Sequence, residues 1–265
     1  KYTLEEHLRF LSIEDKDYEI LYSIWDLNKK NLTQGLSLIS SSFPHYSIHD
    51  VSHSMTIIDN IQCFLGEERI KRLSATDTFL ILMAGLTHDI GMILMFNIVE
   101  AEWGNDDFKA LLEEFANSHD SVVAKSANLL IKIHMNEAKE YLKDFKWALQ
   151  VKNAVIILTA EIFRAKHAKQ SANYLRSNET FKQLANNFHA EQLPSRFMDL
   201  LANIAFLHGE DFDAVMVKLY QEANGYKGDY IHPRFIAYMI RLGDLLDFDN
   251  NRFNIYSKAI LKEIP

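Results

Sequence analysis

The chain has 265 residues, of which 48% are hydrophobic and 24% charged, so its composition is that of an ordinary globular protein. The net charge of -8 argues against a general nucleic-acid binder, which usually presents a basic field, and against long duplex DNA as a partner. Cys63 is the only cysteine, which excludes an intramolecular disulfide and a cysteine-based zinc site.

Helical periodicity runs through the first part of the chain. Only 9 glycines and 4 prolines interrupt the sequence, which favours long helices over a many-turned β fold. Ser74 and Asp77 resemble the capping box of an especially apolar helix, and Gly91 suits its end. Apolar spacing predicts helices within residues 4–30 (one or two), 32–42, 50–65 and 74–91.

The second part continues the helical pattern and contains one clear turn signal, at residues 224–229, which predicts a turn or short hairpin. Residues 92–149 carry several amphipathic segments and are expected to form an accessory helical region. No linker rich in Pro, Gly or Ser is visible, so we expect one all-α domain over residues 1–265, with a core of about 43–91 and 151–252. Further helices are predicted over residues 151–176 (one long or two short), 178–190, 194–208, 211–223 and 233–247.

Six nitrogen and oxygen donors lie on or beside the most apolar of these helices. A lone histidine on an apolar helix is more often a satisfied core group than a ligand. Several together are harder to explain in that way, because each buried polar group without a partner costs about 1–3 kcal/mol. Imidazole and carboxylate together suit a divalent metal. The six residues are His53, His88, Asp89, His167, His208 and Asp244.

Three stretches resemble the motifs of the HD-domain superfamily of metal-dependent phosphohydrolases. Residues 49–54 (HDVSHS) resemble the first motif, with His53 at the ligand position, and residues 86–91 (LTHDIG) closely match the defining His-Asp motif. Residues 241–252 (RLGDLLDFDNNR) resemble the last motif, with Asp244 as its closing ligand. The resemblance spans about residues 43–252. The last of these motifs and the spacing of His49 and His53 also resemble HD modules that precede Hsp90-like ATPase domains in bacterial proteins. This second resemblance implies a possible ATPase domain beyond Pro265.

The order of the donors is that of the expanded form of this superfamily, which carries extra histidines for a second metal. The resemblance implies one or two divalent ions, of which Mn, Fe, Zn and Mg are the candidates. Asp247, three residues after Asp244, could orient a ligand. The first ion would be held by His53, His88, Asp89 and Asp244, and the second by His167 and His208 with Asp89 as the bridge.

The resemblance further implies an enzyme that cleaves a phosphoester or phosphodiester of a nucleotide-type substrate by a metal-activated hydroxide. His49 is a candidate for the catalytic set, although a helix-start residue facing water explains it equally well. The candidate catalytic residues are Asp89, His49, His167 and Lys166. The candidates for binding the substrate phosphate are Arg164, Lys166 and Arg252.

Three alternative functions stay open at this point. The domain could be a nucleotide-sensing module with little turnover, a single-strand nuclease, or a di-iron oxygenase. A small phosphorylated molecule, most simply a nucleotide, is the expected partner in the first case and the expected substrate of the phosphohydrolase. Because the chain lacks an apolar run of about 18 residues and a signal-peptide pattern, we expect no membrane association and a cytoplasmic location.

Overall fold

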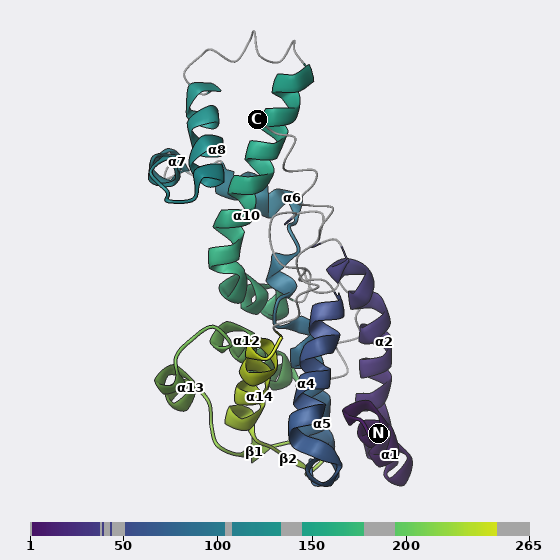
Figure 1. Cartoon of the computed structure of the whole chain (residues 1–265). Coiled ribbons are helices and arrows are strands. Elements are labelled where there is room, and N and C mark those ends of the chain that lie inside the picture. The colour runs from purple at the N-terminus through teal and green to yellow at the C-terminus, as the bar shows by residue number, and fades with distance from the viewer. Residues whose placement is uncertain are drawn as a thin grey trace. The chain divides into compact units, whose positions relative to one another are not determined.

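The computed structural model describes residues 2–37, 39, 43, 51–103, 108–133, 145–177 and 194–247. His49, Arg252 and the helix expected over residues 178–190 therefore lie outside the described residues. Within them the fold is all-α, with eleven α-helices and a single two-stranded hairpin, as predicted (Figure 1). The elements are α1 (Leu4–Glu14), η1 (Lys16–Tyr18), α2 (Glu19–Leu36), α4 (Val51–Ile70), α5 (Ala75–Thr87), η2 (Ile90–Met92), α6 (Phe96–Trp103), α7 (Phe108–Ala116), α8 (Ser121–Lys132), α10 (Phe145–Arg176), α12 (Ser195–Leu207), α13 (Phe212–Lys218), β1 (Ala223–Asn224), β2 (Tyr230–Ile231) and α14 (Pro233–Leu245).

The chain divides into two compact units. Helix α10 is one continuous helix and belongs to both, because its residues up to Ala165 lie in the second unit and those from Lys166 in the first. The second unit includes most of the residues that the sequence assigns to an accessory region, while the expected single domain stays a prediction. Unit 1 comprises residues 1–39, 48–93 and 166–252, and unit 2 comprises 40–47, 94–165 and 253–265.

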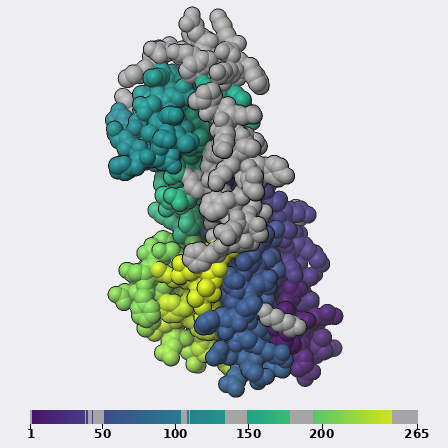
Figure 2. Space-filling view, viewed as in Figure 1, coloured from purple at the N-terminus to yellow at the C-terminus, as the bar shows by residue number. Residues whose placement is uncertain are grey.

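Helix α5 is the centre of unit 1. All 13 of its residues are buried, as expected of an especially apolar helix. Helices α1, α2, α4, α12 and α14 all pack against it. In Figure 2 the yellow atoms of α14 lie beside the blue atoms of α4, two helices that also pack against each other. Helix α5 is thus surrounded by helices from distant parts of the sequence.

The start of α5 is tied to the start of α14. Ser74 caps α5, since its Oγ accepts a hydrogen bond from the Asp77 amide at 2.9 Å, as the sequence predicts. The Asp77 carboxylate does not complete a capping box. It accepts a hydrogen bond from the His232 backbone amide at 2.8 Å and pairs with His232 Nδ1 at 2.7 Å. Burial raises the pKa of Asp77, and the bonds from His232 oppose that shift. Because α5 and α14 start together, their C-terminal ends can carry side chains to one place.

Unit 2 has its own apolar core. Helices α7 and α8 pack on each other, and Trp103 donates from Nε1 to the Thr159 hydroxyl at 3.1 Å. The buried core of this unit consists of Leu112, Val123, Ala127, Leu130, Ala154, Ile157 and Leu158.

No single described helix is long and apolar enough to cross a membrane. Among the described helices, only α5 with η2 and α6 meet that length and composition together, and they do so as a bent pair.

Candidate metal centre

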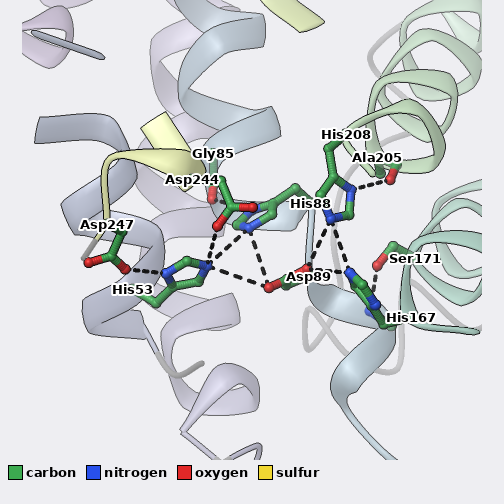
Figure 3. A network of polar contacts seen from close by, with 11 residues as sticks. His53, Gly85, His88, Asp89, His167, Ser171, Ala205, His208, Asp244 and Asp247 are labelled. Carbon is green, nitrogen blue, oxygen red and sulfur yellow. Dashed lines mark hydrogen bonds and ion pairs between the residues drawn. The ribbon is translucent and has the colours of Figure 1, made fainter. Parts of the chain in front are cut away.

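The six predicted donors come together inside unit 1 (Figure 3). They are delivered by five helices that are far apart in the sequence. The ends of apolar helices provide most of them, so the carrier helices are fixed by core packing while the polar groups meet where the helices stop. His53 lies near the start of α4, His88 and Asp89 follow α5, His167 is on α10, His208 follows α12, and Asp244 is near the end of α14.

Asp89 lies at the middle of the group, between two pairs of imidazoles (Figure 3). Its Oδ2 is 3.5 Å from His53 Nε2 and 3.4 Å from His88 Nε2. Its Oδ1 is 3.4 Å from His167 Nε2 and 3.5 Å from His208 Nε2. Each carboxylate oxygen therefore faces one pair of histidines, which is the arrangement expected of a ligand shared between two ions.

The donors form two groups of three. His53, His88 and Asp244 make up one group, and Asp89, His167 and His208 the other; within each group the ligand atoms lie within 4.8 Å of one another. The Nε2 atoms of His53 and His88 are 3.3 Å apart, and those of His167 and His208 are 3.0 Å apart. Two ring nitrogens at this distance repel unless a proton or a cation lies near both lone pairs. Each group could therefore hold a metal ion.

The orientation of two rings follows from the hydrogen bonds of their Nδ1 atoms. His88 Nδ1 donates to the Gly85 carbonyl at 3.0 Å, and His208 Nδ1 donates to the Ala205 carbonyl at 2.6 Å. A carbonyl can only accept, so these partners assign the proton to Nδ1 and leave the Nε2 lone pair of the neutral ring for a cation. This tautomer, fixed by a partner behind the ring, is the one that metal-binding histidines usually show.

His53 is oriented by Asp247. His53 Nδ1 lies 2.5 Å from Asp247 Oδ2, and both side chains are buried. Asp247 lies two residues past the end of α14 and three beyond Asp244, and its amide donates to the Asp244 carbonyl at 3.0 Å. The same short turn therefore provides both a donor of the first group and the carboxylate that orients another donor. The spacing of three residues was the sequence signal for this contact.

Two of the histidines have opposite pKa shifts. Burial lowers the pKa of His88, but the charge and hydrogen bond of Asp89 together with Asp244 outweigh it and raise the pKa to about 9. Burial lowers the pKa of His208 to about 4, with His88 and His167 adding to the effect and Asp89 opposing it. In the metal-free protein the acidic centre therefore holds a proton on one ring and keeps another neutral.

His167 is positioned by a close contact between α10 and η2. The Gly91 amide donates to Ser171 Oγ at 2.8 Å, and Tyr174 donates to the Ile93 carbonyl at 3.0 Å. A Cβ at Gly91 would lie 2.4 Å from both the His167 carbonyl oxygen and the Ser171 amide nitrogen. The sequence assigned Gly91 to the end of the apolar helix, but α5 ends at Thr87 and Gly91 lies in η2. Glycine is needed there for close packing against α10.

The structure describes two of the four remaining candidate residues, Lys166 and Arg164. Lys166 precedes His167 on α10 and is exposed. Arg164 is also exposed and belongs to unit 2. His49 and Arg252 are outside the described residues. The predicted substrate-binding and catalytic roles of these four residues stay predictions.

A helical bundle that collects the donors His, His-Asp, His, His and Asp in this order is an HD-type domain with a possible metal site. A protein-family model described as HD-CE matches residues 43–262, which is most of the chain. The chain belongs to the HD-CE family, and the resemblance seen in its three sequence motifs is confirmed. Comparison with curated proteins and with solved structures gives no match.

Proposed function

We propose that the protein is a metal-dependent phosphohydrolase that cleaves a phosphoester or phosphodiester bond of a nucleotide-type substrate. The proposal depends on one observation: four imidazole Nε2 atoms surround the Asp89 carboxylate, which faces both pairs of rings, and Asp244 joins the pair formed by His53 and His88. Nitrogen and carboxylate donors suit first-row divalent ions better than calcium. Membership of an HD-type family supports hydrolysis as the reaction class.

Each donor group has a definite part in this proposal. His53, His88 and Asp244 would hold one ion, His167 and His208 would hold a second, and Asp89, which faces both pairs of rings, would serve both groups. Bound divalent ions supply Lewis acidity and lower the pKa of a water, so that it can attack phosphorus at neutral pH. The chain contributes ligand positions that are fixed and largely shielded from solvent, because the Asp89 side chain is 6% exposed and the His88 side chain is fully buried.

The exposure of the donors indicates the side from which a substrate enters. The side chains of Asp244 and His167 are 33% and 26% exposed, whereas those of His53 and His208 are 1% and 4% exposed. A phosphate group therefore approaches past Asp244 and His167. If only the first ion is bound, His167 is the accessible imidazole and the natural general acid for the leaving oxygen. Lys166, next to His167 and exposed, is suited to attract the anionic substrate.

The test compares the wild type with Asp89→Asn after loading with manganese or iron. We expect one or two ions per wild-type chain and a loss of metal in the variant, because the shared carboxylate loses its charge. Metal-dependent release of phosphate or of cleaved product is expected from at least one member of a panel of nucleotides, cyclic dinucleotides and short single strands. Asp199→Asn is the matched control, since Asp199 is exposed on α12.

The possible outcomes separate the alternatives. Nucleotide binding without turnover by the metal-loaded protein would replace the enzyme by a sensory module. Cleavage confined to single strands would make it a nuclease, and dioxygen consumption by the iron form would make it an oxygenase. If Asp89→Asn retained full metal content, the centre described above would not be the metal site.

A further inference from the structure

Most arginines near the C-terminal half of unit 1 have protein partners. Arg241 differs: across residues 166–177 and 194–247 it is the one arginine to which the structure gives no hydrogen bond or ion pair. The other three donate hydrogen bonds to acceptors on neighbouring elements. Arg176 donates to Asn203 Oδ1, Arg196 to the carbonyls of Asn224 and Gly225, and Arg234 to those of Met216 and Leu219.

Arg241 lies at the edge of the candidate metal centre. It precedes Asp244 by three residues on α14, so the two side chains project from neighbouring positions on the helix surface. Ile240 and Gly243 mark the buried face of α14. At 100° per residue, Asp244 falls at the border of that face and Arg241 falls next to it on the outer side. Asp244 is one of the two most exposed donors, so Arg241 is adjacent to the side that opens to solvent.

Arg241 is half-buried, and its natural intramolecular partner is used elsewhere. An arginine and an aspartate three residues apart on a helix commonly pair, but Asp244 Oδ1 is directed to His53 Nε2 at 3.4 Å instead. A partly desolvated guanidinium without a partner is unfavourable in the free protein. Its five N–H donors match the oxygens of a phosphate group, which can bind in a bidentate manner.

We propose that Arg241 binds a phosphate group of the substrate beside the His–Asp centre and so contributes to substrate specificity. This inference rests on the proposed function, because it assigns a recognition residue to the same site. Arg241 acts by binding and charge neutralisation at the rim and is not a metal ligand. It explains how a chain of net charge -8 retains a phosphorylated molecule next to the carboxylates of Asp89 and Asp244.

The test uses Arg241→Gln and Arg241→Lys, with Arg9→Gln as the matched control. Arg9 is exposed on α1, and its substitution removes the same charge. Isothermal titration of the metal-loaded proteins with inorganic phosphate is the first readout, and metal content is the second. We expect phosphate to bind roughly ten- to a hundredfold more weakly to Arg241→Gln, the effect of losing charge-assisted hydrogen bonds. Arg241→Lys should recover part of the loss, and the metal content should not change.

Kinetics distinguish a failure of this inference from a failure of the proposed function. For any substrate the wild type turns over, Arg241→Gln should raise KM by a similar factor and change kcat little. Turnover with an unchanged KM and unchanged phosphate binding would overturn the role of Arg241 and leave the phosphohydrolase intact. If the wild type shows no turnover but its phosphate binding still depends on Arg241, the proposed hydrolysis would be wrong and the role of Arg241 in binding phosphate would stand. No phosphate binding by the wild type at millimolar concentration would overturn the anion site.

Discussion

Gly91→Ala should damage the second donor group while leaving the first in place. The added Cβ would lie 2.4 Å from the His167 carbonyl oxygen and the Ser171 amide nitrogen, about 1 Å closer than ordinary van der Waals contact. Both atoms belong to the backbone of α10, so no side-chain rotation can relieve the overlap. Either α10 or η2 has to move by about that amount, and in both cases His167 and Asp89 separate.

The magnitude follows from two costs. Overpacking a well-packed contact by one methyl group costs about 1–3 kcal/mol. A weakened hydrogen bond from the Gly91 amide to Ser171 Oγ adds about 1 kcal/mol. We therefore expect the free energy of unfolding to fall by about 2–4 kcal/mol. Metal–ligand distances tolerate errors of only about 0.2 Å, so a 1 Å displacement of His167 should abolish binding by the second group.

The assay is urea unfolding of the metal-free proteins together with a cobalt titration followed by absorption. Gly209→Ala is the control: Gly209 also lies beside a donor, but an added Cβ there meets no atom within 4 Å. Gly91→Ala should bind less cobalt than the wild type, and Gly209→Ala should bind the same amount. Wild-type stability and cobalt binding in Gly91→Ala would show that α10 does not depend on this contact for the position of His167.

Two further predictions concern single histidines. Asp247→Ala should weaken metal binding about ten- to a hundredfold, because the His53 ring loses the partner that orients it. Asp247→Asn keeps an acceptor oxygen and should weaken metal binding less. Equal losses in the two variants would refute an orienting role for Asp247. Burial lowers the pKa of His7, whose Nε2 donates to the Leu73 carbonyl. The unfolded state therefore binds more protons as pH falls below about 6.5, so stability should fall there by up to about 1.4 kcal/mol per pH unit. Urea titrations at several pH values should show that the free energy of unfolding falls less steeply with decreasing pH in His7→Gln than in the wild type. An unchanged slope would contradict a neutral His7 in the folded protein.

Composition and local pattern predicted the all-α fold and marked the six donors, and the resemblance to HD domains implied that these six residues would meet. Apolar periodicity marks α5 and α14 as buried helices, and a His or Asp at the end of such a helix is conspicuous. Contacts between distant segments leave no local signal. The bond between Asp77 and His232, 155 residues apart, replaced half of an expected capping box. In the same way, Gly91 was assigned to a helix end because its partner on α10 lies 80 residues away.

The histidines differ in how far sequence alone can orient them. His88 and His208 follow the last residue of an apolar helix, and in each case Nδ1 donates to the carbonyl three residues earlier. The last carbonyls of a helix lack intrahelical donors, so a histidine at this position satisfies one of them and directs Nε2 away from the helix. Partial negative charge at the helix end also favours a cation beyond it. A histidine directly after a buried helix is therefore oriented by local geometry, whereas His167, inside α10, depends on the packing of that helix against Gly91.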